Sequence, residues 1–261
     1  MGQLSEKLPL SVAIITYNEE EDLPKTLESV KDIASEIIIV DSHSTDKTVE
    51  IAKAYGAKVY KEEWKGFGKQ KNSALEKCTQ PWILSIDADE VVSPELKESI
   101  IKELKNPKFD CYEINRKTFY LGKFLEHVWF PEWRLRLFKK GKAFFSGDIH
   151  ETIKCKGKVG RLEGLLYHYS FKNLEEHFSK TIKYAKISAE AEFKKGKKFK
   201  LYKLFLNPAW AFFKIYFLKG GILDGVRGLA VAKNCSYSRF IKYMFLWELH
   251  EKNKNKGGKY E

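Results

Sequence analysis

"PWILSIDADEVVSPELKESI" occupies residues 81–100 and joins an apolar run, an acidic turn and a polar segment with helical spacing. The continuous apolar letters predict a buried strand over 81–87. Ser93 followed by Pro94 is a typical helix start, which predicts a helix over 93–105. The acidic letters DADE therefore come directly after the end of a buried strand, a position that requires a chemical reason.

The same alternation of strand and helix runs through the first hundred residues. Apolar, β-branched runs predict strands over 10–17, 36–42 and 57–62, and helical spacing predicts helices over 20–33, 44–56 and 68–78. Strands that are apolar throughout indicate a mostly parallel sheet covered on both faces by helices, an α/β fold. In such sheets ligands bind beyond the carboxyl ends of the strands.

The remaining sequence is irregular at first and then helical. Residues 110–170 carry short strand-like patterns, and helical, basic and aromatic stretches follow at 174–196, 199–221 and 224–249. We therefore expect a catalytic domain over 1–170 and a helical C-terminal region over 171–250. The polar, lysine-rich letters of 251–261 predict a disordered tail.

The net charge of +12 is distributed unevenly along the chain. Residues 1–100 hold 12 lysines and 19 acidic residues, a net −7, whereas the remainder holds 35 basic and 16 acidic residues, a net +19. This asymmetry indicates an anionic partner for the second half, such as nucleic acid, a phosphorylated substrate or a membrane surface. A lysine-rich proteome would explain the total charge but not its distribution.

The four cysteines, Cys78, Cys111, Cys155 and Cys235, are scattered and form no CxxC pair. This spacing predicts neither a zinc site nor a disulfide framework and favours a reducing compartment. The first ten residues also lack the long apolar segment of a secretory signal. The expected location is therefore the cytoplasm.

The pair Asp87 and Asp89 predicts a site for a divalent cation, Mg²⁺ or Mn²⁺, because carboxylate oxygens are the ligands that these ions prefer. Residues i and i+2 of a strand share one face, so both carboxylates are expected to converge, with a diphosphate completing the shell. The alternative is a turn rich in acidic residues with no ligand.

Polar residues at the other strand ends are candidate nucleotide ligands. Glu19 could accept hydrogen bonds from ribose hydroxyls, and Asp41 could accept the imide N–H of uracil. Lys69 or Lys71 could pair with phosphate, while Asn72 could hold the loop before the helix. Ordinary helix capping and solvated lysines are the alternatives for these positions.

These pieces, in this order, resemble glycosyltransferase family 2, the inverting sugar transferases with the GT-A fold. The resemblance is carried by "SVAIITYNEEEDLPKTLESV", "EIIIVDSHSTDKTVEIAKAYGAKV", "GKQKNSAL" and "WILSIDADEVVSPE", and it extends through "DIHETI" into the helical region. Over nearly the whole chain the sequence is similar to bacterial lipopolysaccharide core β-1,4-glucosyltransferases. One departure is His43, where the family usually has glycine, and this bears on base selectivity.

The resemblance implies transfer of glucose from UDP-glucose to a heptose of the lipopolysaccharide inner core, with a divalent cation as cofactor. It implies the following nucleotide-binding residues: Thr16, Tyr17, Asn18, Glu19, Asp41, Ser42, Lys71, Asn72, Asp87 and Ala88. Asp87 and Asp89 would hold the metal.

Inversion needs a base on the sugar face opposite the leaving group, so a metal-bound aspartate cannot serve. We favour Glu151 as the base, with His150 as a third metal ligand; Glu132 is the second candidate for the base, and His168 another candidate ligand.

The candidate acceptor or phosphate residues are His127, Trp129, Arg134 and Arg136. The two rings could frame an acceptor sugar, because aromatic faces stack on sugars. The two arginines could instead contact diphosphate or an acceptor phosphate.

The basic stretch at 194–203 and the aromatic run after it predict an amphipathic helix on the cytoplasmic face of the inner membrane. We expect Trp210, Phe212, Phe213, Tyr216 and Phe217 to insert and the lysines to meet anionic lipid. Packing of these aromatics on the catalytic domain is the alternative. Attachment would suit a lipid-linked acceptor.

Three other functions fit parts of the pattern. A nucleotidyltransferase or a dinucleotide dehydrogenase would place glycines after the first strand, and "TYNEEED" has none. A catalytically retired module that binds lipid or nucleic acid would explain the charge, but not the retained carboxylates. The sequence predicts no nucleic-acid partner and leaves the oligomeric state open.

Overall fold

The computed structural model describes residues 7–147, 152–171 and 173–257. The chain forms two compact units, each with its own core. The first comprises residues up to 117 together with 131–169, and the second comprises 118–130 and residues from 170 onward. The segment 118–130, expected within the catalytic domain, therefore groups with the C-terminal helices.

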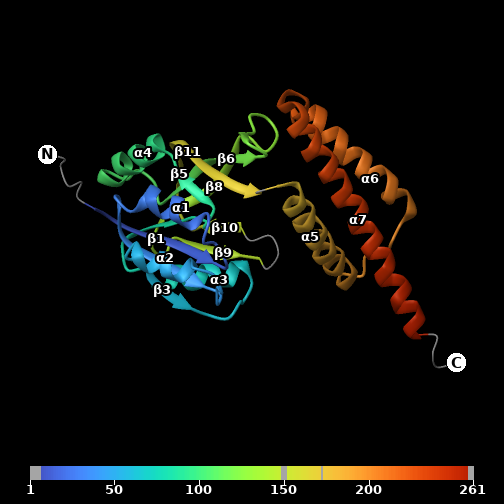
Figure 1. Ribbon diagram of the computed structural model, residues 1–261, viewed down its shortest axis with the longest axis horizontal. Coiled ribbons are helices and arrows are strands. Elements are labelled where there is room, and N and C mark those ends of the chain that lie inside the picture. Colours follow the sequence, from blue (N-terminus) through green and yellow to red (C-terminus); the bar gives the residue numbers. More distant parts are fainter. Residues whose placement is uncertain (1–6, 148–151, 172, 258–261) are drawn as a thin grey trace. The chain divides into compact units, whose positions relative to one another are not determined.

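A nine-stranded sheet in the order β3-β2-β1-β4-β8-β6-β11-β5, with β7 paired to β6, is the central element within the described residues (Figure 1). Its strands are β1 (Leu8–Thr16), β2 (Ala34–Asp41), β3 (Lys58–Lys61), β4 (Trp82–Ser85), β5 (Glu90–Val92), β6 (Cys111–Tyr120), β7 (Lys123–Phe124), β8 (Glu132–Lys139) and β11 (Val159–Phe171). Strands β1 to β4 pair in parallel, as predicted, whereas β8 joins β4 and β6 antiparallel. The predicted α/β class is confirmed, with the parallel part limited to the first four strands.

Side chains alternate between two cores because both faces of the parallel strands are buried. On β2, Ile37 and Ile39 belong to the core with α1 (Leu23–Val30), α2 (Thr48–Ala54) and α4 (Pro94–Lys105). The intervening Ile38 and Val40 belong to the core with α3 (Phe67–Lys77). The sheet edge where β1, β2 and β4 end is therefore held rigidly from both sides.

The start of α4 shows why the acidic turn is fixed in place. The Ser93 hydroxyl accepts a hydrogen bond from the Leu96 N–H at 3.1 Å, which confirms the predicted cap. Gly164 of β11 lies against this first turn with a φ of 89°, and a Cβ there would be 2.2 Å from the Leu96 nitrogen. The close backbone approach requires glycine.

A two-stranded antiparallel sheet, β9 (Ala143–Ser146) with β10 (Thr152–Cys155), covers part of the α3 core. It brings Cys155 to Cys111 of β6, with Cα atoms 6.5 Å apart, in a disulfide. The prediction that the cysteines form no disulfide was wrong, because the two partners are 44 residues apart and only the folded sheets bring them together.

The described residues of the second unit form the α-helices α5 (Leu174–Lys194), α6 (Leu201–Phe213) and α7 (Gly225–Gly257). The π-helical turn η1 (Lys214–Leu218) and the 3₁₀ turn η2 (Gly221–Asp224) connect α6 to α7. Both α5 and α6 pack on α7 (Figure 1). Within the described residues, no helix is long and apolar enough to cross a membrane.

Helix α7 continues to Gly257, past residue 251, where the sequence predicts a disordered tail. Its last turns carry the ion pairs Glu248–Lys252 and Glu251–Lys254, at 2.5 and 2.8 Å. Such i,i+4 and i,i+3 pairs support helix at its exposed end. Residues 258–261 lie outside the described residues.

Candidate active site

The ends of β1 and β2 form one side of the candidate site. Thr16 and Asp41 are register partners, and the Thr16 hydroxyl donates to the Asp41 carboxylate at 2.8 Å. The N–H and hydroxyl of Ser44 donate to the same carboxylate at 2.9 and 2.5 Å. Asp41 is fully buried, so the predicted contact with a base N–H has to use its remaining acceptor capacity.

Two residues of these loops adopt left-handed backbone conformations. Asn18 has a φ of 56°, and its side-chain oxygen accepts the Thr45 N–H at 2.8 Å. His43 has a φ of 61°, the conformation that explains why the family usually has glycine there. Its Nε2 lies 3.2 Å from a carboxylate oxygen of Glu63, so the ring is directed toward the segment after β3.

The other nucleotide candidates lie around the same sheet edge. Ser42 is buried and its hydroxyl accepts from the Gln70 amide at 3.2 Å, whereas Tyr17 is exposed. The backbone N–H of Glu19 donates to the Thr48 hydroxyl at 2.7 Å. Ala88 is buried. Asp46 accepts the N–H of Thr48, the first residue of α2, at 3.0 Å.

Asp87 lies between two cations. One oxygen of its carboxylate is 2.7 Å from the Lys71 Nζ, and the other is 2.9 Å from an Arg136 Nη. Burial alone would raise the pKa of Asp87, but Lys71 and Arg136 hold it well below its usual value. Asp87 is therefore ionised at neutral pH and orients two positive side chains at the sheet edge.

Glu90 and Arg116 complete this network, and the sequence analysis missed both. Fully buried Glu90 accepts from Arg136 at 2.6 Å and from Arg116 at 3.1 Å through one oxygen. Its other oxygen accepts the Asp87 N–H at 3.0 Å. The third carboxylate of DADE was the one sequence feature that could have indicated Glu90. Its contacts position Asp87 and the two arginines.

The geometry of the aspartate pair differs from the prediction. Strand β4 ends at Ser85, and Asp87 to Asp89 lie in a turn in which the Glu90 N–H donates to the Asp87 carbonyl at 3.1 Å. The strand rule for residues i and i+2 does not apply there. Asp89 instead lies beside β11, where its carboxylate is 3.4 Å from the Nε2 of His168.

Asp89 and His168 are the residues that fit a divalent cation. The Nδ1 of His168 is buried and has no hydrogen-bond partner, and Nε2 is directed at Asp89. No group of three His, Cys, Asp or Glu side chains gathers for a metal in the parts of the chain that the structure describes. Two protein ligands suit Mg²⁺ or Mn²⁺ when substrate phosphates supply the others. His150, the predicted third ligand, lies outside the described residues.

The two candidate bases differ in what the structure shows. Glu132 accepts from Arg116 at 2.7 Å and from Arg134 at 2.5 Å. Burial raises its pKa, but the two arginines outweigh that effect, so the pKa of Glu132 is lowered. A carboxylate stabilised in its ionised form is a weaker base. Glu151 lies outside the described residues.

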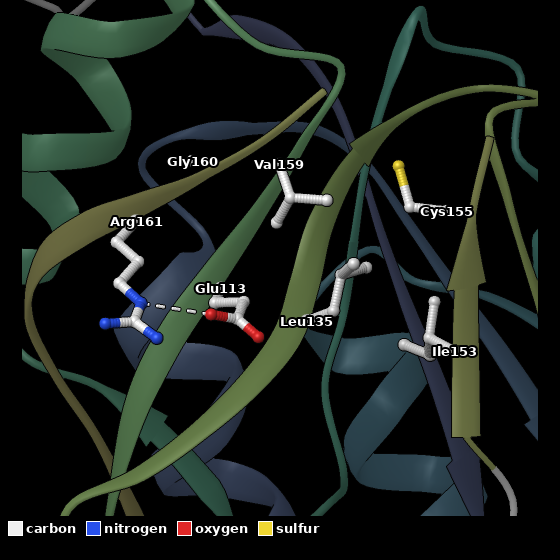
Figure 2. Close-up of a pocket in the computed structure, with 7 residues that line it drawn as sticks. All are labelled: Glu113, Leu135, Ile153, Cys155, Val159, Gly160 and Arg161. Carbon is white, nitrogen blue, oxygen red and sulfur yellow. Dashed lines mark hydrogen bonds and ion pairs between the residues drawn. The ribbon is translucent and has the colours of Figure 1, made fainter. Parts of the chain in front are cut away.

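Two hollows adjoin on this unit. One, of about 460 Å³, is polar and is lined by Lys71, Asp87, Glu113, Arg116, Trp133, Arg134, Leu135, Arg136, Phe145, Thr152 and Ile153. The other, of about 700 Å³, shares Glu113, Leu135 and Ile153 with it. Figure 2 shows the larger one, where Arg161 turns toward Glu113 at 3.1 Å and Val159, Leu135 and Ile153 form an apolar wall. The smaller hollow holds the charged network and is the candidate active site.

Three residues that the sequence analysis assigned to the site make packing contacts. Asn72 donates to the Phe145 carbonyl at 2.9 Å and accepts its N–H at 2.8 Å, which fastens α3 to β9. In the second unit, the Trp129 ring packs against Tyr120 and His177. His127 lies there too, beside Asp224 (Nδ1 to Oδ1 3.2 Å), whose carboxylate also accepts the N–H groups of residues 126–128. Lys69 is exposed on α3.

Comparison with known proteins decides the family. The model of "Glycosyl transferase family 2" matches residues 11–161, which include the whole acidic turn and the strands around it. The chain belongs to glycosyltransferase family 2. It is accordingly a glycosyltransferase with the GT-A fold.

Relatives within this family match over nearly the full length. A lipopolysaccharide core biosynthesis glycosyltransferase, LpsC, of Rhizobium meliloti (strain 1021) is 34% identical over 94% of this chain and 94% of its own. An uncharacterized glycosyltransferase of Rickettsia typhi is also 34% identical, over 94% of this chain and 89% of its own. S. aureus TarS 1-349, solved in complex with UDP-GlcNAc, has a TM-score of 0.50 at 16% identity and covers 98% of this chain and 93% of its own. The last similarity concerns the fold alone.

Proposed function

We propose that this glycosyltransferase moves a hexose, glucose, from a UDP-sugar to a heptose of the lipopolysaccharide inner core with inversion at the anomeric carbon. The observation that carries the proposal is the polar hollow of about 460 Å³, in which Lys71 and Arg136 pair with Asp87 and Arg116 and Arg134 are part of the same lining. A cluster of cations beside a carboxylate suits a diphosphate and its metal. The full-length similarity to LpsC supports the class of acceptor.

In this proposal Lys71 and Arg136 bind the diphosphate of the donor. Both are buried and both already pair with the Asp87 carboxylate, so their positive charges are oriented before the nucleotide arrives. Thr16 and Asp41 shape the pocket for the nucleoside at the neighbouring strand ends. The exposed ring of Tyr17 is available to stack on the base.

Asp89 and His168 would hold Mg²⁺ or Mn²⁺, as judged from the 3.4 Å between the Asp89 carboxylate and the His168 Nε2. The bound ion would neutralise charge on the departing diphosphate. Asp87 would contribute by fixing Lys71 and Arg136 and by contacting the nucleotide, the role that its position between the two cations favours.

The reaction is a single displacement. The acceptor hydroxyl oxygen bonds to the anomeric carbon while the bond from that carbon to the diphosphate oxygen breaks, and the hydroxyl proton passes to a carboxylate base. We propose Glu151 as that base. Glu132 is the weaker candidate because Arg116 and Arg134 lower its pKa, so its role is to position the two arginines.

The deciding experiment is a transfer and hydrolysis screen across nucleotide sugars with and without Mn²⁺. We expect turnover of UDP-sugars in the wild-type protein and loss of turnover in Asp89→Ala. Binding of Mn²⁺ in the presence of UDP, measured by electron paramagnetic resonance, should weaken in both Asp89→Ala and His168→Ala. Unchanged turnover in Asp89→Ala would contradict the proposed site, and release of pyrophosphate from nucleoside triphosphates would point to a nucleotidyltransferase.

The base is tested separately. Glu151→Gln should abolish transfer while UDP binding, measured by calorimetry, stays as in the wild-type protein. Glu132→Gln should retain slow transfer. If transfer persists in Glu151→Gln and is lost in Glu132→Gln, the two roles are exchanged.

A further inference from the structure

Helix α6 and turn η1 expose a continuous apolar face in the second unit. Along 201–218 the exposed residues come in adjacent pairs, and the pairs repeat every four positions. This spacing places them on one face of a helix. We name this face the apolar stripe, and it consists of Leu201, Tyr202, Phe205, Leu206, Ala209, Trp210, Phe213, Phe217 and Leu218. Leu201, Phe205 and Trp210 are 64%, 65% and 58% exposed. Lys214 is the single charged residue among these outward positions.

The opposite face of the same helix is the one that packs on α7, and it is more polar. Asn207 donates to the Tyr243 hydroxyl at 2.6 Å, and Leu204 packs with the core around Tyr243. Phe212 stacks on Tyr216 and lies under the Lys233 ammonium of α7. Of the five aromatics that the sequence analysis expected to insert, Phe212 and Tyr216 are therefore half-buried on the packed face.

The stripe is too large for an incidental surface feature. The segment 201–218, which carries the stripe, spans about 27 Å at the rise of an α-helix. Beyond η1, the side chains of Ile222, Leu223 and Val226 are exposed as well. A typical monomer exposes no apolar patch larger than about 600 Å², and such patches mark binding surfaces.

Charge identifies the chemistry of the partner. Between Glu192 and Asp224 the chain has eight lysines (194, 195, 197, 198, 200, 203, 214 and 219) and no acidic residue. Five of them precede the stripe, and Lys214 and Lys219 lie at its far end. Apolar side chains flanked by lysines fit the boundary between headgroups and acyl chains of an anionic bilayer.

We propose that the apolar stripe inserts into the surface of an anionic membrane, with α6 parallel to the plane of the bilayer. The helix is too short and too charged to span, and Pro208 and η1 interrupt regular hydrogen bonding within it. This inference rests on the proposed function in one respect only: the purpose of the membrane contact is to bring the enzyme to a lipid-linked acceptor. The contact itself is testable without any transfer.

The test is flotation of the full-length protein with vesicles of phosphatidylcholine, alone or with 30% phosphatidylglycerol. We expect binding to the anionic vesicles only, weakened by salt. Phe205→Ser with Trp210→Ser should lower the partition coefficient at least tenfold, since two aromatic rings no longer leave water on binding. Trp247→Ser is the matched control: Trp247 is 43% exposed on α7, outside the stripe, and its loss should leave partition unchanged.

Three results would overturn the proposal: no flotation of the wild-type protein, equal loss in Trp247→Ser and in the stripe variant, or a dimer that only the stripe variant disrupts. The last, measured by light scattering, would make a second copy of the chain the occupant. Hydrolysis of the UDP-sugar in solution distinguishes the two proposals. A stripe variant that hydrolyses donor normally but fails to float separates membrane contact from catalysis.

Discussion

Replacing Glu90 by glutamine tests whether the third carboxylate of DADE holds the active site together. The substitution keeps the size of the side chain but turns one carboxylate oxygen into an N–H donor group. In the native structure one oxygen accepts from Arg136 and Arg116, and the other accepts the Asp87 N–H. Whichever way the amide is turned, its NH₂ group faces a donor, so a buried polar group loses its acceptor.

The expected cost follows from the burial of these groups. Glu90 is fully buried and Arg136 nearly so, and the removal of one partner from a buried ion pair costs about 3–5 kcal/mol. The glutamine oxygen keeps one hydrogen bond, which favours the lower end, about 3 kcal/mol. A typical domain is stable by about 5–15 kcal/mol, so the variant should fold but unfold in less urea.

The assay is urea unfolding followed by circular dichroism, together with calorimetric UDP binding. Glu113→Gln is the matched control, because Glu113 pairs with a single arginine, Arg161, that is largely exposed. That pair should contribute less than about 1 kcal/mol. If Glu90→Gln costs no more than Glu113→Gln, or binds UDP as tightly as the wild-type protein, the positioning role of Glu90 is refuted.

Two further predictions concern the second unit. Burial lowers the pKa of His177 from 6.5 to about 4, so below pH 6.5 the unfolded state binds the proton more readily than the folded state. The free energy of unfolding should therefore fall by about 2 kcal/mol from pH 7.5 to pH 5. In His177→Phe, urea titrations should no longer show this pH dependence. A Cβ on Gly228 would be 1.8 Å from the Gly221 carbonyl oxygen. Gly228→Ala should therefore lower the free energy of unfolding by about 1–3 kcal/mol and loosen the packing of α7, measured as faster amide exchange in η2. Unchanged exchange would contradict the close packing.

The parts of the fold set by local chemistry were predictable from the sequence. Apolar runs place β1, β2 and β4 within two residues of their observed ends, and the Ser93–Pro94 pair fixes the start of α4. These features depend on side chains a few positions apart, which a reader of the sequence sees directly. The carboxyl ends of parallel strands meet at one edge for topological reasons, so the location of the candidate site was predictable as well.

The parts set by long-range contacts were not predictable. Glu90 meets Arg116 and Arg136 only because β5 pairs with β11, at the end of a sheet that also contains β6 and β8. The pairing of Cys111 with Cys155 depends in the same way on two separate sheets. Periodicity on α6 shows that two faces exist, but only the position of α7 decides which face remains exposed.

The three carboxylates of the acidic turn make different contacts. Asp87 is held by cations and orients them, Asp89 is directed at His168, and Glu90 is buried as the counter-ion of two arginines. Without Glu90, Arg136 and Arg116 would repel each other inside the unit, and only Asp87 would remain to neutralise Arg136 and Glu132 to neutralise Arg116. In the proposed mechanism Glu90 supplies that charge, so Asp87 and Arg136 can separate when the diphosphate of the donor binds. Glu90, a buried carboxylate with no proposed role in the reaction, thus stabilises the cluster of cations at the edge of the sheet.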